Sequence, residues 1–190
     1  MKTNIKSISM RFILAAGLAA CINTGHAQGI VASGTLVGVP GSGNTFDYTL
    51  TLANSASATT SIEGFWYAWI PGFFFLPTVP SSESGGTSGW TASLFGNSIQ
   101  FQGTAANAIA PGQSAAFSFV STDSPATLAG TSQGFPIGDS VAYPGVINFS
   151  ASPPNEEITV MSIVPEPSVL SLVAAGALGM LALRRRNVSA

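Results

Sequence analysis

Alternating apolar and polar side chains in the stretch TFDYTLTL, residues 45–52, restrict the fold of this chain more than any other feature. An aromatic or leucine side chain occupies every second position, and Asp or Thr stands between them. Successive side chains of a β-strand point to opposite faces, whereas a helix repeats about every 3.6 residues. The stretch therefore predicts a strand with one buried and one solvated face. The apolar side is formed by Phe46, Tyr48, Leu50 and Leu52.

Short runs of the same β type fill the rest of the region between residues 28 and 163, and turn signals separate them. These signals include the Pro-Gly pairs that begin at Pro40, Pro71 and Pro111. Because no amphipathic helix pattern interrupts the series, we predict an all-β fold, an antiparallel immunoglobulin-like β-sandwich. Residues 80–89, PSSESGGTSG, are expected to form a flexible loop. The further candidate strands are IVASGTLVGV, SIEGFWYAWI, WTASLF, SIQFQ, SAAFSFVS, SVAYPGVINFS and EITVMSIV.

The body of the chain, between Gln28 and Pro165, contains no Lys, Arg, His or Cys. Nucleic-acid binding depends on Lys and Arg side chains that neutralise phosphates, so we expect no nucleic-acid partner. The only cysteine of the chain is Cys21, which precludes an intrachain disulfide. Stability must therefore come from the burial of apolar surface.

The same composition removes most catalytic chemistry from the body. Ser-His-Asp and Cys-His machinery needs a histidine, and the usual zinc sites need histidine or cysteine. A glycosidase needs only two carboxylates and stays a remote alternative; a calcium site is another, although no D-x-D-x-D-G loop supports it. We expect no enzymatic activity, no metal and no cofactor. The triplet NFS at Asn148 fits the N-glycosylation pattern, and we interpret it as a chance match within a strand. The acids of the body are Asp47, Glu63, Glu83, Asp123, Asp139, Glu156 and Glu157.

Aromatic side chains are concentrated in the stretch GFWYAWIPGFFFLP, residues 64–77. Both faces of a strand formed by its first half would be apolar, which favours a central, buried strand. Exposed aromatics can instead stack on sugar rings, so the alternative is a carbohydrate-binding platform made of Trp66, Trp69 and Trp90. The three consecutive phenylalanines cannot all face inward, and at least one ring is expected at the surface. Strand alternation would separate Phe65, Tyr67 and Trp69 from Trp66, Ala68 and Ile70.

The first 27 residues have the layout of a cleavable secretory signal. Basic residues precede an apolar run over residues 12–22, which is expected to form the signal helix, and small side chains lead up to Ala27. Signal peptidase is therefore expected to cut between Ala27 and Gln28 and to release the body outside the cytoplasm. A competing interpretation is the lipoprotein pattern LAAC, in which Cys21 is lipidated and becomes the new N-terminus.

Near the other end, residues 168–183 form an uncharged apolar run after Pro167. At about 1.5 Å per residue, a helix of this length spans roughly 24 Å, slightly less than the hydrocarbon core of about 30 Å. Arg184, Arg185 and Arg186 follow at once, and the positive-inside tendency keeps them in the cytoplasm. We predict a single C-terminal transmembrane helix with the body outside.

Val164, Pro165, Glu166 and Pro167, followed by the apolar run and the three arginines, resemble a PEP-CTERM sorting signal. The resemblance implies that exosortase, an integral-membrane cysteine transpeptidase of Gram-negative bacteria, recognises the Pro-Glu-Pro motif and cleaves near it. It implies an inner-membrane anchor before cleavage, and afterwards a place at the cell surface or in an exopolysaccharide or biofilm matrix. The body, in GFWYAWIPG and IAPGQSAAFSF, is similar to secreted β-sandwich proteins with this tail, a likeness that implies no activity.

The sequence thus divides into a signal peptide (1–27), a β-sandwich ectodomain (28–163) and a sorting signal (164–190). We expect an exported, non-enzymatic surface or matrix protein whose partners are signal peptidase, exosortase and extracellular polysaccharide, and the membrane through its C-terminal helix. The alternative function is a carbohydrate-binding module that uses exposed aromatics. The remote alternative is the two-carboxylate glycosidase.

Overall fold

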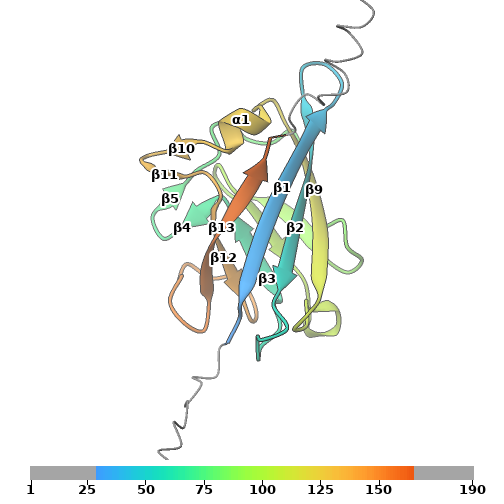
Figure 1. Ribbon diagram of the computed structural model, residues 1–190, viewed down its shortest axis with the longest axis vertical. Helices are drawn as coiled ribbons and strands as arrows, with labels where there is room; N and C mark the ends of the chain where they lie inside the picture. Colours follow the sequence, from blue (N-terminus) through green and yellow to red (C-terminus); the bar gives the residue numbers. More distant parts are fainter. Residues whose placement is uncertain (1–28, 165–190) are drawn as a thin grey trace, which may run out of the picture.

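The computed structural model describes residues 29–164, which include all of the predicted ectodomain except Gln28 (Figure 1). Strands dominate this part of the chain, which confirms the all-β prediction. None of its helices has the length and hydropathy to cross a bilayer. The predicted signal helix and the predicted transmembrane helix lie outside these residues. The elements are β1 (Ala32–Pro40), β2 (Phe46–Asn54), β3 (Gly64–Tyr67), β4 (Trp69–Ile70), β5 (Phe73–Phe74), β6 (Ser82–Ser84), β7 (Thr91–Leu94), β8 (Ile99–Gln102), a 3-10 helix η1 (Ala105–Asn107), β9 (Ser114–Ser121), α1 (Pro125–Leu128), β10 (Thr131–Ser132), β11 (Phe135–Pro136), β12 (Asp139–Tyr143) and β13 (Glu156–Ile163).

β2 shows the alternation that its sequence predicts. Tyr48, Leu50 and Leu52 are buried, while the alternate residues Asp47 and Thr49 are exposed. β9, its hydrogen-bonded neighbour, repeats the pattern with its phenylalanines inward and its serines mostly outward. Period-two patterning therefore decides which face of these strands forms the core.

The main sheet of the described residues has nine strands in the order β6-β9-β2-β1-β13-β12-β3-β8-β7. Its neighbours run antiparallel, as predicted, except β1 and β13, which are parallel with Val37 beside Ile163. The prediction of an entirely antiparallel sheet is wrong at this one pair. Parallel neighbours need a long connection, and here almost the whole domain lies between the two strands. The immunoglobulin-like arrangement stays a prediction.

The nine-stranded sheet folds over so that its two halves face each other across one core, with β13 joining them. Phe101 of β8 stacks on Phe117 of β9, with ring centroids 4.4 Å apart, although these strands stand near opposite ends of the sheet order. Tyr67 of β3 meets Phe119 of β9 at 5.7 Å. In Figure 1, β1, β2 and β9 form the nearer layer, with β3 behind them. The apolar faces of both halves are thereby removed from water.

Several predicted boundaries need correction. The predicted strand SVAYPGVINFS ends at Tyr143, because Pro144 and Gly145 begin a loop. Part of the predicted flexible loop at residues 80–89 is the edge strand β6, which pairs with β9. The helix α1 begins at Pro125 after Ser124, whose side chain accepts a hydrogen bond from the Thr127 amide. That is a favourable helix start, but one too short to show an amphipathic pattern.

Candidate functional site

The predicted strand SIEGFWYAWI is interrupted at Ala68, whose backbone is left-handed with φ of 59°. Phe65 and Tyr67 face the main core, as alternation requires. Trp69, which alternation assigns to that same face, instead joins Trp66 on the opposite side. Their rings stack at 3.9 Å with planes 7° apart. The left-handed residue thus reverses the side-chain direction and creates a second, smaller core on the outside of the β3–β12 half.

Neither tryptophan of this pair forms an exposed sugar platform. Trp66 and Trp69 are at most 1 % exposed, and the Trp66 indole donates a hydrogen bond of 2.7 Å to Ser98 Oγ. Trp90 lies elsewhere, in the main core against Phe117, with its indole hydrogen-bonded to the Asn107 carbonyl. The predicted core packing of the aromatic stretch is confirmed for Trp66 and Trp69, and Trp90, which the sequence suggested only for the platform, is buried as well. The alternative, in which they line up at the surface, is wrong because apolar neighbours cover each of them.

The loop between β12 and β13, residues 144–155, covers the second core. Ile147 and Ala151 pack against the tryptophan pair. Phe149 stands edge-on to both indoles, with its ring centroid 5.3 Å from that of Trp66, although the residue as a whole is 67 % exposed. Every second side chain from 147 to 151 therefore points toward the tryptophans, and the intervening polar side chains are left for the other side of the loop.

Hydrogen bonds hold this loop to the sheet. The Tyr143 hydroxyl donates to the Asn148 carbonyl at 2.8 Å, and the Ile147 amide donates to Gln102 Oε1 at 3.0 Å. Burial raises the pKa of Tyr143 above its ordinary value, so the phenol keeps the proton that it donates. The loop is thus fixed at its start by side chains of β12 and β8.

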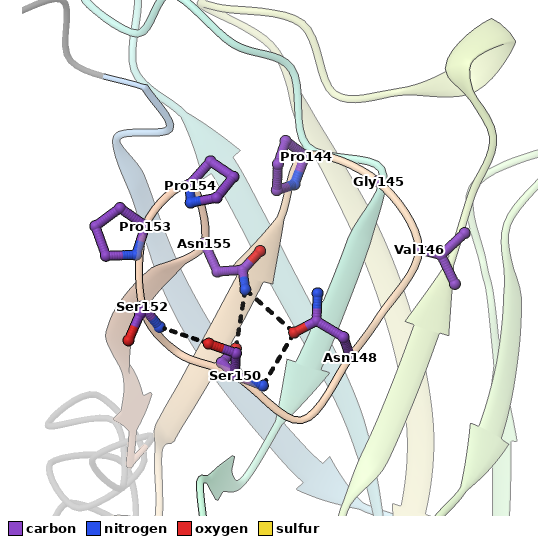
Figure 2. A pocket seen from close by; sticks show the side chains of 9 residues that line it. All are labelled: Pro144, Gly145, Val146, Asn148, Ser150, Ser152, Pro153, Pro154 and Asn155. Atoms are coloured by element: carbon purple, nitrogen blue, oxygen red, sulfur yellow. Dashed lines mark hydrogen bonds between the residues drawn. The ribbon is translucent and has the colours of Figure 1, made fainter.

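The same loop encloses a hollow of about 420 Å³, whose lining includes none of the residues that pack on the tryptophans (Figure 2). Its volume falls within the range of small-molecule sites, roughly 300–1,000 Å³. Prolines supply apolar walls, and asparagines and serines supply hydrogen-bonding groups. Its lining contains no charged side chain. The lining residues are Pro144, Gly145, Val146, Asn148, Ser150, Ser152, Pro153, Pro154 and Asn155.

Two asparagine amides are held against each other inside the loop, as Figure 2 shows. Asn148 Oδ1 accepts from the Ser150 amide at 2.9 Å and from Asn155 Nδ2 at 3.3 Å. Asn155 Nδ2 also donates to the Ser150 carbonyl at 3.0 Å. These bonds engage the oxygen of the Asn148 amide and the nitrogen of the Asn155 amide. Asn148 Nδ2, a donor, and Asn155 Oδ1, an acceptor, have no hydrogen-bond partner among the described residues, and both residues line the hollow.

The carboxylates do not contribute to this hollow. Asp123 is buried, and its Oδ2 accepts hydrogen bonds from the amide and the hydroxyl of Thr78. Asp139 is also buried, and its Oδ1 accepts from the Thr159 hydroxyl. Both acids therefore tie strands and loops together. Within residues 29–164, no three acids, histidines or cysteines gather in a metal-binding group.

The predicted processing residues lie almost entirely outside the described part of the chain. Val164, the first residue of the predicted sorting motif, directly follows β13 and is 44 % exposed. The remaining predicted processing residues lie beyond residues 29–164: Ala27, Gln28, Pro165, Glu166, Pro167, Arg184, Arg185 and Arg186.

Sequence reasoning missed the paired amides. Asn148 attracted notice only as part of a glycosylation triplet, and its placement in a strand was wrong. Asn155 follows two prolines in a segment that reads as an ordinary turn. The alternation of Ile147, Phe149 and Ala151 with polar residues was the available signal. This alternation is also typical of a strand, because a loop that covers an apolar cluster can place every second side chain on that cluster.

Comparison with known proteins identifies no family for this chain. No family model matches it, and no curated protein is similar enough to count as a match. A GH20 exo-β-N-acetylglucosaminidase from Vibrio harveyi, solved with N-acetylglucosamine, aligns at a TM-score of 0.44 and 14 % identity over 71 % of this chain and 18 % of the enzyme. A chitin-binding domain from Streptomyces coelicolor aligns at a TM-score of 0.34 and 20 % identity over 47 % of this chain and 77 % of that domain. Neither likeness reaches a TM-score of 0.5, and neither carries an assignment of fold or function.

Proposed function

We propose that the chain is an exported, non-enzymatic protein of the cell surface or extracellular matrix, processed by exosortase at its C-terminal sorting signal and associated with exopolysaccharide or biofilm. Signal peptidase removes residues 1–27, and the apolar run at residues 168–183 holds the chain in the inner membrane until exosortase acts. The three arginines keep the extreme C-terminus in the cytoplasm.

The observation that carries this proposal is the position of the motif relative to the folded domain. β13 is hydrogen-bonded to β1 on one side and β12 on the other, and it ends at Ile163. Pro165, Glu166 and Pro167 follow after a single residue. Cleavage at the motif would therefore remove no strand from the described sheet, and the body would keep its fold after release.

The chemistry of the body supports a binding or structural role over catalysis. It lacks the bases and nucleophile partners named above, and its two buried acids are engaged by threonines. We also propose the immunoglobulin-like β-sandwich for its strand arrangement, supported by two facing halves of mainly antiparallel strands.

Substitution of Glu166 by Gln in the native host tests the processing step. The change removes the only charge of the motif and leaves its prolines in place. We expect the E166Q protein to accumulate in the inner membrane with its tail attached, at several times the level of the uncut original protein. Membrane fractionation followed by immunoblotting of the two sizes measures this.

The matched control is Glu157→Gln, which makes the same chemical change at an exposed position of β13 outside the motif. The control protein should be processed like the original. Equal processing of E166Q and the original would contradict recognition of the motif, as would a source organism without an exosortase.

A further inference from the structure

We infer that the hollow in the β12–β13 loop is a binding site for a neutral saccharide, centred on the amides of Asn148 and Asn155. This inference rests on the proposed function, because an exported matrix protein meets extracellular polysaccharide. It assigns the contact to residues other than the buried tryptophans.

The amide pair has unused hydrogen-bonding capacity. Asn155 is only 7 % exposed, yet its Oδ1 has no partner among the described residues. Every fully covered side-chain nitrogen or oxygen of these residues has a partner, so Asn155 Oδ1 is open to solvent, and Asn155 lines the hollow. An acceptor that no protein group engages and that solvent reaches can exchange its bound water for a hydroxyl group of a ligand.

The free donor and acceptor of this pair match the hydroxyl groups of a sugar. Asn148 Nδ2 can donate a hydrogen bond and Asn155 Oδ1 can accept one. The other atoms of the two amides, Asn148 Oδ1 and Asn155 Nδ2, are hydrogen-bonded to each other at 3.3 Å. A hydroxyl group both donates and accepts, so two neighbouring hydroxyls of a pyranose can satisfy both atoms at once. Proline rings in the walls offer C–H surface against the apolar edge of a sugar ring.

Charge restricts the ligand further. No Asp, Glu, Lys or Arg lines the hollow. The body as a whole carries acids without any basic residue. A phosphorylated or uronic-acid ligand would find no cation to pair with and would be repelled by the net charge of the domain. A neutral ligand avoids both penalties.

A peptide ligand fits the site less well. Extended peptides commonly bind by adding a strand to a free sheet edge. The strands that flank the hollow offer no such edge, since β12 is hydrogen-bonded to β3 and β13, and β13 to β12 and β1. The apolar contact available is also limited to proline rings and Val146.

The site is held in place before any ligand arrives. Ile147, Phe149 and Ala151 pack on the tryptophan pair, and the Tyr143 hydroxyl and Gln102 fix the start of the loop. The two amides are oriented by their hydrogen bonds to Ser150. Binding therefore orders few groups, which lowers its entropic cost.

Nuclear magnetic resonance of the protein isolated from ¹⁵N-labelled native cells tests the inference. The probes are cellohexaose, mannohexaose and chitohexaose, with hexagalacturonate as the charged comparison. We expect at least one neutral hexasaccharide to shift the side-chain amide signals of Asn148 and Asn155. We expect the Trp90 indole signal, which reports on the main core, to stay unchanged.

Two occluding variants locate the contact. A Cβ at Gly145 would meet no atom within 4 Å, so Gly145→Tyr adds a ring to the hollow without a backbone clash. Ser152→Tyr adds one from the opposite end of the loop, at an exposed position whose hydroxyl makes no hydrogen bond among the described residues. Each should weaken saccharide binding at least tenfold. Thr35→Tyr, at an exposed position of β1 outside the hollow, is the matched control and should bind like the original.

Three outcomes would overturn the inference: no neutral hexasaccharide shifts the two amide signals, both occluded variants bind like the original, or a neutral hexapeptide shifts these signals where no saccharide does. Backbone spectra of the variants show whether they fold. The C-terminal mass of the same samples reports on processing separately, so loss of saccharide binding with a correctly cut tail leaves the proposed sorting function standing.

Discussion

Ala68 is the residue on which the arrangement of the aromatic stretch depends. Its positive φ turns Trp69 toward Trp66, and its amide donates to Ser140 Oγ at 3.1 Å while its carbonyl accepts from the Phe75 amide at 3.0 Å. A left-handed backbone costs a non-glycine residue roughly 1–2 kcal/mol. The stacked indoles and these two hydrogen bonds offset that cost.

Substitution of Ala68 by Val should destabilise the domain strongly. A β-branched side chain is poorly tolerated at positive φ, and the site is fully buried, so overpacking adds to the backbone cost. We expect a loss of about 2–4 kcal/mol in the free energy of unfolding, measured by urea denaturation. Ala68→Gly, which relieves the backbone and removes one methyl group, should stay within about 1 kcal/mol of the original. Equal stability of the Val and original proteins would contradict the described backbone.

At the scale of single elements, β13 joins the two halves of the sheet, and its close packing depends on small residues on its neighbours. Val160 is buried, its side chain lies close above Gly34 of β1, and its backbone lies beside Gly138 just before β12. A Cβ on Gly138 would come within 2.1 Å of the Val160 carbonyl oxygen. Neither strand could approach β13 as closely with a larger residue at these positions.

Gly138→Ala should therefore cost about 1–3 kcal/mol of folding free energy, because the backbone must shift to admit one methyl group. Gly145→Ala is the matched control, since open space surrounds its Cβ position, and it should change stability by less than about 0.5 kcal/mol. Thermal and urea unfolding of the two variants measure the difference. Similar losses for both would argue against the described contact between Gly138 and β13.

The strands with one apolar face were predictable because period-two patterning survives without tertiary information. β1, β2, β9 and β13 lie close to their predicted positions for this reason. The parallel pairing of β1 and β13 was not predictable, because no local signal records which distant strand becomes a neighbour. The reversal at Ala68 was missed since alanine carries no turn signal. The amide pair was missed because its hydrogen bonds connect ordinary loop residues.

For the whole molecule, the absence of histidine, cysteine and lysine from residues 29–164 governs the dependence of stability on pH. The titratable side chains of this part are carboxylates and tyrosines. Burial raises the pKa of Tyr67 and Tyr143; it also raises that of Tyr48, with a smaller contribution from the nearby Asp123. Folding therefore favours the neutral phenols over their ionised forms.

We expect the free energy of unfolding to change little between about pH 6 and 9 and to fall as the pH rises above about 10. Above the ordinary tyrosine pKa of about 10, the unfolded chain releases phenolic protons that the folded chain keeps, so stability decreases with pH. Below a pH of about 10, the phenols are neutral in both the folded and the unfolded chain, so their contribution to stability is fully present. Urea denaturation across this range, with tyrosinate absorbance as a second readout, measures it. A stability transition between pH 6 and 8 would contradict this expectation.

Export of the body and its release at the sorting motif leave a defined mass at each end of the protein, which mass spectrometry of material from native cells can read. We expect an N-terminus at Gln28 and a C-terminus close to Pro165, Glu166 and Pro167, without the apolar run or the arginines. A surface-located protein that still ends at Ala190 would contradict it.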